Sequence, residues 1–208
     1  MTIDYPMASI RFHKFAIEGM QDIQKQTEKS KAFYFPYVEE KRGVADKLLV
    51  ELAKNAAAVI TDDYPTYFVP QMTAEAKGSI QTTYELVDSN GLLPIRIAEK
   101  EYVRAHDFRR FMHKNIEDFL VEVPEKDPLE YLNLKFDEKL LEPIFKKYDL
   151  VDFNKVNTQD FLKNLNVDKS VEVSDVVGGY NAAKSRLDLF AKKGFNDYSK
   201  LRSHPSED

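Results

Sequence analysis

Two adjacent aspartates and one asparagine follow predicted strands, at positions where a ligand could reach them. Asp62 and Asp63 follow the apolar run Ala57–Ile60 after a single threonine, and Asn90 lies in the turn after a second predicted strand. In open α/β sheets the carboxyl ends of the strands form the ligand-binding crevice. Carboxylates and an amide there could bind a metal ion or a ribose hydroxyl. The pattern predicts a crevice for a nucleotide-like molecule.

The same residues also fit a purely structural role. An aspartate just before Pro65 can cap a turn with its own side chain, and Asp88–Gly91 has the composition of a turn. Phosphotransfer sites of the haloacid-dehalogenase type use D-x-D, whereas the two aspartates here are adjacent. On residue chemistry alone, turn capping is the preferred interpretation of this pair.

Several other kinds of chemistry lack their usual residues in this sequence. The absence of cysteine excludes disulfides, thiolate zinc sites and a cysteine nucleophile. The sequence has no G-x-S-x-G, G-x-G-x-x-G or G-x-x-x-x-G-K motif. Its four histidines have no metal-ligand spacing and are interpreted as surface or packing residues: His13, His106, His113 and His204. We therefore assign no catalytic residue and no metal site.

Length and composition predict a globular chain of one domain, or one domain and part of another. Its 208 residues are 43% hydrophobic and 31% charged, which suits a buried core and a soluble surface. The longest apolar run, residues 56–60, is far too short to span a bilayer. The first residues lack the basic and apolar regions of a signal peptide. A cytoplasmic protein without a membrane partner is the expectation.

Charge is unevenly distributed along the chain. The net charge is −5, but the segment Val177–His204 carries +4 and the remainder −9. A basic tail on an acidic body can be a phosphate-facing surface that binds DNA without sequence specificity. Judged on charge alone, a solvated helix face is the preferred interpretation of this segment.

The first hundred residues alternate helix and strand patterns. Apolar residues recur at helical spacing in three segments and form short apolar or aromatic runs in three others. The expected order is helix Ala8–Lys25, strand Ala32–Val38, helix Val44–Ala56, strand Ala57–Ile60, helix Val69–Lys77 and strand Thr82–Val87. This alternation predicts an α/β fold with a parallel sheet, in which Ala57–Ile60 is buried on both faces.

The pattern changes after residue 100. Tyr102–Leu120 has the spacing of a strong helix, and Asp137–Tyr148 is expected to be helical despite Pro143. Residues 149–175 read as a polar linker with a short helix around Asp160, and a final helical stretch begins at Val177. A helical second part is therefore expected to follow the α/β part.

Several short motifs occur along the chain in the order typical of one family. They are Ile3–Ser9, Arg11–Phe15, Phe35–Glu39, Val59–Pro65, Val87–Pro94 and Phe108–Phe111, followed by Gly178, Gly179, Ala182, Ala183, Leu187, Phe190 and Tyr198-x-x-x-Arg202-x-x-Pro205. The set resembles the photolyase/cryptochrome superfamily, and most closely bacterial deoxyribodipyrimidine photolyases with features of class II.

This resemblance implies an N-terminal α/β antenna domain, a long linker and a helical FAD domain. Mapped here, it gives an antenna-type domain at residues 1–120, a linker at 121–175 and the beginning of the FAD domain at 176–208. Family members use light-excited reduced FAD to repair a cyclobutane pyrimidine dimer flipped out of DNA. The residues carried over are Tyr198, which would contact FAD, and Arg202, which would lie at the DNA surface. The crevice near Asp62, Asp63 and Asn90 would suit an antenna chromophore.

The sequence also departs from the family pattern. Compared with a complete member it lacks the first strands of the sheet, and it stops before the G-x-S-x-L-S loop that holds the FAD phosphates. It contains no tryptophan, so the electron-relaying tryptophans of the family cannot be present. We therefore expect a fragment of a photolyase-like DNA repair lyase that is inactive alone. The alternative is a non-enzymatic, cryptochrome-like module that binds a nucleotide or chromophore.

The resemblance makes one further prediction about the sheet. The missing strands would leave the strand Ala32–Val38 separated from the other two. We expect it either to pair directly with Ala57–Ile60, or the gap to be filled by a second copy or a complementing fragment, because unpaired strand edges recruit partners. An antiparallel sheet would overturn the family assignment, so the expected direction of Ala57–Ile60 and Thr82–Val87 is parallel.

Overall fold

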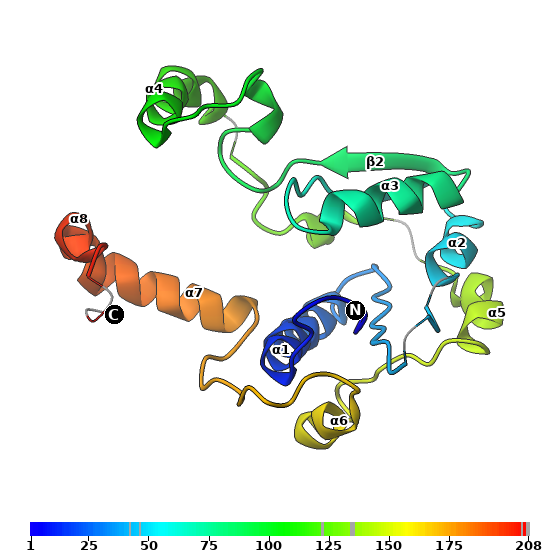
Figure 1. Cartoon of the computed structure of the whole chain (residues 1–208). Helices are drawn as coiled ribbons and strands as arrows, with labels where there is room; N and C mark the ends of the chain where they lie inside the picture. The colour runs from blue at the N-terminus through cyan, green and yellow to red at the C-terminus, as the bar shows by residue number, and fades with distance from the viewer. Residues whose placement is uncertain (42, 46, 122, 134–135, 205, 207–208) are drawn as a thin grey trace. The chain divides into compact units, whose positions relative to one another are not determined.

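The computed structural model describes residues 1–41, 43–45, 47–121, 123–133, 136–204 and 206 (Figure 1). The chain divides into two compact units. Unit 1 comprises Met1–Ala45, Leu129–Asp137 and Phe145–Asp208, and unit 2 comprises Asp46–Pro128 and Glu138–Ile144. Each unit therefore combines segments that are distant in sequence. The predicted division into residues 1–120, 121–175 and 176–208 stays a prediction.

Unit 1 is built around the long helix α1 (Ile10–Thr27), whose bounds are close to those of the predicted helix Ala8–Lys25. Ser9 caps its first turn by accepting a hydrogen bond from the Phe12 amide at 3.4 Å. Its apolar stripe places Ile17 in the core without any exposure. Helix α6 (Thr158–Asn164) packs against α1, and its Asn157 side chain caps the first turn. The core cluster is Ile17, Val38, Val151, Phe153, Leu162 and Leu165.

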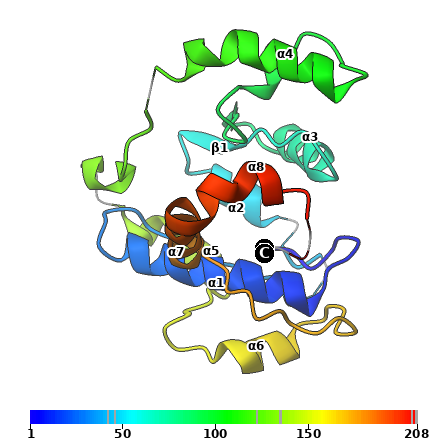
Figure 2. The same cartoon turned by 90° about the vertical axis from the view of Figure 1, so that its left-hand side faces the viewer.

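The C-terminal part of unit 1 is helical but not one regular helix. It consists of α7 (Tyr180–Leu189), a π-helical turn (Phe190–Gly194), a 3₁₀ turn (Phe195–Asp197) and α8 (Tyr198–Leu201). Figure 2 shows the change of direction between α7 and α8. A side chain at Gly194 would come within 2.9 Å of the Phe190 ring, so glycine lets the wide turn close.

Unit 2 contains a parallel pair of strands joined by a helix. Strands β1 (Ala58–Asp62) and β2 (Thr83–Val87) pair in register from Ala58 opposite Thr83 to Asp62 opposite Val87. This direction confirms the parallel prediction. The helix α3 (Val69–Ser79) connects them and runs alongside β2 in Figure 1. Helix α2 (Leu48–Ala53) precedes β1, and the Thr82 hydroxyl donates to the Ala53 carbonyl at 2.7 Å.

The remaining elements are short, apart from α4 (Ala105–Asn115). Helix α5 (Glu142–Phe145) tolerates Pro143 because it stands in the first turn, where no intrahelical donor is needed. The 3₁₀ helices are Ile95–Ile97, Ile116–Phe119, Pro128–Tyr131 and Glu138–Leu141. No helix in the described part of the chain combines the length and apolarity needed to cross a membrane.

Two predictions about the strands are wrong. Residues 32–38 form no strand and do not pair with β1. Pro36 has no N–H to donate to a neighbouring strand, and the backbone of this segment makes isolated hydrogen bonds to loops instead. The Pro36 carbonyl accepts a hydrogen bond from the Val151 amide at 3.0 Å, and just after this segment the Glu39 amide donates to the Met1 carbonyl at 2.8 Å. In addition, β1 is not buried on both faces, since Ile60 is 64% exposed.

Candidate functional site

The structure brings the three predicted crevice residues together at the carboxyl ends of β1 and β2. The Asn90 side-chain amide donates to the Asp63 carbonyl at 2.7 Å, and the Ser89 hydroxyl donates to the Asp62 carboxylate at 2.5 Å. The backbone continues the strand pairing here, because the Asp63 amide donates to the Val87 carbonyl at 2.8 Å. These residues, with Asp88 and Arg96, are called the strand-end cluster below.

Arg96 and Asp88 complete the strand-end cluster, and neither was predicted as a site residue. The Arg96 guanidinium forms a bidentate ion pair with Asp63, with one contact of 2.8 Å between Nη2 and Oδ1. Asp88 accepts from the Ile95 amide at 2.6 Å and from Asn90. Arg96 therefore reaches the aspartates because Asp88 fixes the turn that carries it.

Hydrogen bonding also determines the charge states in the strand-end cluster. The Ile95 amide holds the pKa of Asp88 below its ordinary value against the opposing effect of burial, and Asn90 and the charge of Arg96 lower the pKa further. The hydrogen bond and charge of Asp63 raise the pKa of Arg96. Asp88 therefore keeps its negative charge, and Arg96 its positive charge, at neutral pH.

A cavity of about 420 Å³ adjoins the strand-end cluster within unit 2. Asp63 and Arg96 stand at its polar side, while the rest of its wall comes from α3, β2 and the segment after β1. Lys77 adds a second cation. The lining residues are Asp63, Tyr64, Pro65, Pro70, Thr73, Ala74, Lys77, Leu86, Ile95 and Arg96. A mostly apolar wall with a few charged groups is typical of pockets for small aromatic molecules.

The two residues carried over from the family lie one helical turn apart on α8. Tyr198 is the first residue of α8, is 52% exposed, and packs its ring edge-on against Phe190 at 5.7 Å. Arg202 follows the last residue of α8 and is exposed, and its amide donates to the Tyr198 carbonyl at 2.9 Å. Their spacing places both on one side of α8. Pro205, the last residue of the same motif, lies outside the described residues.

The start of α7 is held by carboxylates of α1. Glu18 accepts from the Gly178 amide at 2.7 Å, and Asp22 accepts from the Asn181 amide at 3.0 Å. Gly179 has a φ of 97°, a conformation that favours glycine. An added Cβ at Gly178 would collide with the Phe15 carbonyl. The Gly178-Gly179 motif thus lets α7 approach α1 closely, and negative charge at its N-terminus stabilises it.

One of the four histidines is buried and the other three are exposed. His13 is fully buried, its Nδ1 lies 2.9 Å from the Ser9 carbonyl, and its ring stacks on Tyr5 at 5.8 Å, which is a packing role. His106 lies 3.6 Å from Asp107 on the exposed side of α4, and His113 and His204 are also exposed. Within the described ranges, no group of three histidine, aspartate or glutamate side chains is placed to hold a metal ion.

Comparison with known proteins gives a photolyase-like relationship. No family model matches the sequence. The chain is 24% identical over 206 residues to a deoxyribodipyrimidine photo-lyase of Methanothermobacter thermautotrophicus. The aligned region covers 99% of this chain and 42% of that protein, so the chain spans less than half the length of this relative.

Proposed function

We propose that this chain is a fragment of a photolyase-like flavoprotein of the class II type. The observation that carries the proposal is the similarity to a deoxyribodipyrimidine photo-lyase along 99% of the chain. In this proposal residues 1–120 form an antenna-type domain with a Rossmann-like sheet remnant, 121–175 a linker, and 176–208 the beginning of an FAD-binding domain. The parallel direction of β1 and β2 supports it.

The proposed reaction is the light-driven repair of pyrimidine dimers, which needs FAD and DNA. The Tyr198 hydroxyl would donate a hydrogen bond to FAD, and Arg202 would pair with a DNA phosphate. Both residues are exposed, Tyr198 at the start of α8 and Arg202 directly after its end. Because the chain has no tryptophan and no G-x-S-x-L-S loop, we propose that it has no repair activity alone. A complementing fragment would supply the rest of the site.

A repair assay tests this proposal directly. The purified chain is mixed with reduced FAD and a duplex carrying one pyrimidine dimer and is then illuminated with blue light. We expect retention of the duplex at low salt and no loss of dimers. Efficient repair by the chain alone would contradict the fragment proposal, and the absence of any DNA retention would contradict the placement of a DNA surface on α8.

Replacing Arg202 by alanine should weaken retention of DNA and lower its salt dependence. One lost phosphate contact reduces the slope of log affinity against log salt by about 1. The measurement is a filter-binding series at several salt concentrations. Lys163→Ala in α6 removes another exposed cation, outside the proposed surface, so equal effects of the two substitutions would argue against a specific role of Arg202.

The second candidate function is a non-enzymatic module that binds a nucleotide or a chromophore. The specific observation in its favour is the cavity beside the strand-end cluster, with Asp63 and Arg96 in its wall. Thermal shift and absorbance titrations with flavin mononucleotide, riboflavin and a deazaflavin test it. A lack of any shift with all three compounds would contradict this candidate.

Asp63→Asn is expected to raise the ratio of the affinities for flavin mononucleotide and riboflavin by roughly tenfold. Arg96, released from the carboxylate, could then donate a charge-assisted hydrogen bond to the phosphate. In the native chain the Arg96 guanidinium already donates its hydrogen bonds to the Asp63 carboxylate, which leaves fewer donors for a phosphate. The amide keeps the size of the side chain and removes its charge. Asp62→Asn is the matched control, since Asp62 contacts Ser89 and not Arg96. An unchanged preference in Asp63→Asn would show that Arg96 meets no phosphate.

A further inference from the structure

Unit 1 contains a cavity of about 490 Å³ that is separate from the strand-end cluster and from α8. Its walls come from the segment after residue 36 and from the segment between α5 and α6, including part of α6. The lining residues are Tyr37, Val38, Glu40, Lys41, Val44, Lys147, Tyr148, Asp149, Leu150, Val151, Val156 and Phe161. We call this cavity the tyrosine pocket.

Two aromatic rings form a corner of the tyrosine pocket. The rings of Tyr37 and Tyr148 lie 5.9 Å apart at an angle of 88°, so their planes meet almost at right angles. Phe161 adds a third aromatic side chain to the wall. The negative face of an aromatic ring attracts cations, and several rings around one space form the aromatic cages that hold quaternary ammonium groups.

The tyrosine pocket is held in place by the core of unit 1. Tyr148 is only 7% exposed, and Val38 and Val151 belong to the core cluster. The Val151 amide donates to the Pro36 carbonyl at 3.0 Å and so connects the two segments that form the walls. A ligand would therefore meet a pocket whose walls are already in position, which lowers the entropy cost of binding.

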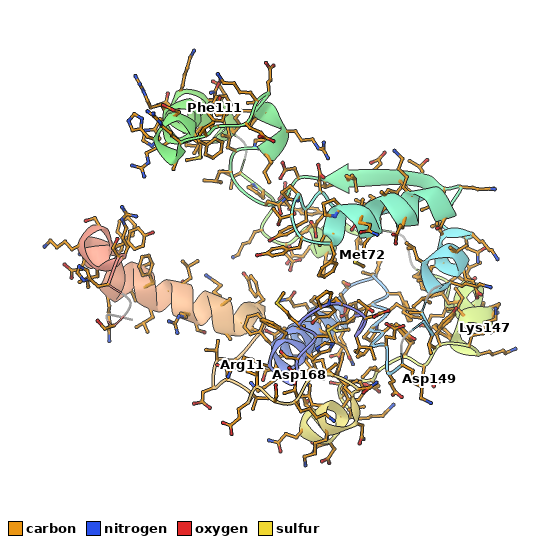
Figure 3. The ribbon with its side chains drawn as sticks, in the orientation of Figure 1. Arg11, Met72, Phe111, Lys147, Asp149 and Asp168 are labelled. Carbon is orange, nitrogen blue, oxygen red and sulfur yellow. The ribbon has the colours of Figure 1, made fainter. Side chains whose placement is uncertain are left out.

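Two carboxylates and two ammonium groups line the same pocket. Glu40 and Asp149 are exposed at its wall, as are Lys41 and Lys147. Figure 3 shows Lys147 and Asp149 on the segment that follows α5. Lys147 already has an interaction partner of its own. The two negative and two positive charges at the wall sum to zero. The groups around the Tyr37 hydroxyl show which charges lie close to the rings.

The surroundings of the Tyr37 hydroxyl are electronegative. Burial raises the pKa of Tyr37, and the negative charges of Glu39, Glu40 and Asp149, together with Tyr148, raise it further. A positive charge placed in the tyrosine pocket would be attracted by the same groups.

We propose that the tyrosine pocket binds a small organic cation of the quaternary or methylated ammonium class. The rings of Tyr37, Tyr148 and Phe161 supply the aromatic faces, while Glu40 and Asp149 supply negative charge at the wall. The methyl groups of such a cation suit the apolar part of the wall. The pocket lies wholly within unit 1, so this inference does not rest on the proposed repair function.

Choline and its uncharged analogue 3,3-dimethylbutan-1-ol test the proposal, because the two differ mainly in charge. Each is titrated into the full chain while the aromatic proton signals of the tyrosines are followed by nuclear magnetic resonance. Choline should bind at least about tenfold more tightly than the alcohol, since cation–π attraction in a desolvated site reaches about 2 kcal/mol. Equal affinities, or no binding of choline, would overturn the proposal.

Two variants separate the aromatic and the charged contributions. Tyr37→Leu keeps an apolar side chain but removes one ring face, and it should weaken choline binding about threefold to thirtyfold. Glu40→Gln combined with Asp149→Asn removes both exposed negative charges of the pocket, and it should weaken choline binding most at low salt. Glu85→Gln, at an exposed position of β2 in unit 2, is the control for general charge effects.

Each variant is first checked by circular dichroism and thermal unfolding, so that a loss of folding is not mistaken for a loss of binding. Choline binding by folded Tyr37→Leu with unchanged affinity would overturn the aromatic role. Inorganic phosphate is the opposing probe: if it perturbs the tyrosine signals and choline does not, Lys41 and Lys147 dominate the pocket and the proposal is wrong.

Discussion

Replacing Gly178 by alanine is expected to lower the free energy of unfolding by roughly 1–3 kcal/mol, because overpacking against rigid backbone cannot be relieved by side-chain movement. The added Cβ would lie 2.9 Å from the Phe15 carbonyl carbon and closer still to its oxygen. Both α1 and the start of α7 would have to shift. Thermal and urea unfolding, followed by circular dichroism, measure the effect.

Gly78→Ala is the matched control for this substitution. Gly78 stands in the last turn of α3, and nothing lies within 4 Å of the position that its Cβ would occupy. Alanine there should stabilise the chain by about 0.5–1 kcal/mol, because it reduces the backbone freedom of the unfolded state. If Gly178→Ala were as stable as Gly78→Ala, the close approach of α1 and α7 would be wrong.

The Gly178 variant also bears on the proposed FAD domain. Glu18 accepts a hydrogen bond from the Gly178 amide, and Asp22 accepts one from Asn181. A shift at Gly178 would weaken both contacts at the N-terminus of α7. Amide hydrogen exchange should therefore rise first in α7, ahead of the core helix α1. Uniform exchange in both helices would contradict this role of the α1 carboxylates.

Local sequence patterns predicted the helices and strands that depend on local signals. The apolar spacing in α1, the short apolar run of β1 and the Tyr, Leu and Val residues of β2 correspond to elements that the structure contains. Parallel strands end at one edge, and hydrogen bonds join Asp63 to Asn90 and Asp62 to Ser89 there; the role of these residues as a ligand site stays a prediction. These parts were predictable because neighbouring residues determine them.

The residues that were missed depend on contacts between distant segments. Arg96 reaches Asp63 only because Asp88 binds the Ile95 amide and turns the chain back. The pairing of a turn aspartate with a nearby arginine is a weak signal that could have suggested this. The aromatic run at 32–38 has strand propensity, but its backbone finds loop partners instead. Tertiary context decided both cases.

Glu39 is a further residue that the sequence did not single out, and it stabilises the same part of unit 1. It is only 3% exposed, and its carboxylate accepts from the Thr2 hydroxyl at 2.6 Å and from the Ile3 and Ala45 amides at 3.4 Å. Burial acts to raise its pKa, but the hydrogen bonds from Thr2, Ala45, Ile3 and Gly43 together hold the pKa below the ordinary 4.5. The ionised form is therefore the one that the fold stabilises.

Glu39→Gln is expected to lower the free energy of unfolding at pH 7 by about 2 kcal/mol, because hydrogen bonds to a charged acceptor are lost. The folded-state pKa lies below the unfolded value of 4.5, so the native carboxylate stabilises the fold above that pH. Its contribution is lost as the pH falls through the lower folded-state pKa. Urea unfolding of both proteins at pH 7 and near pH 3–4 should show the difference shrinking in acid.

Glu40→Gln distinguishes this effect from a general loss of one negative charge. Glu40 is the next residue along the chain and is exposed, so removing its negative charge should cost little folding free energy. Its substitution should change the free energy of unfolding by less than about 0.5 kcal/mol at either pH. If Glu39→Gln were equally mild, or if its effect grew in acid, the carboxylate of Glu39 would not be the group that holds the segments around Thr2 and Ala45 together.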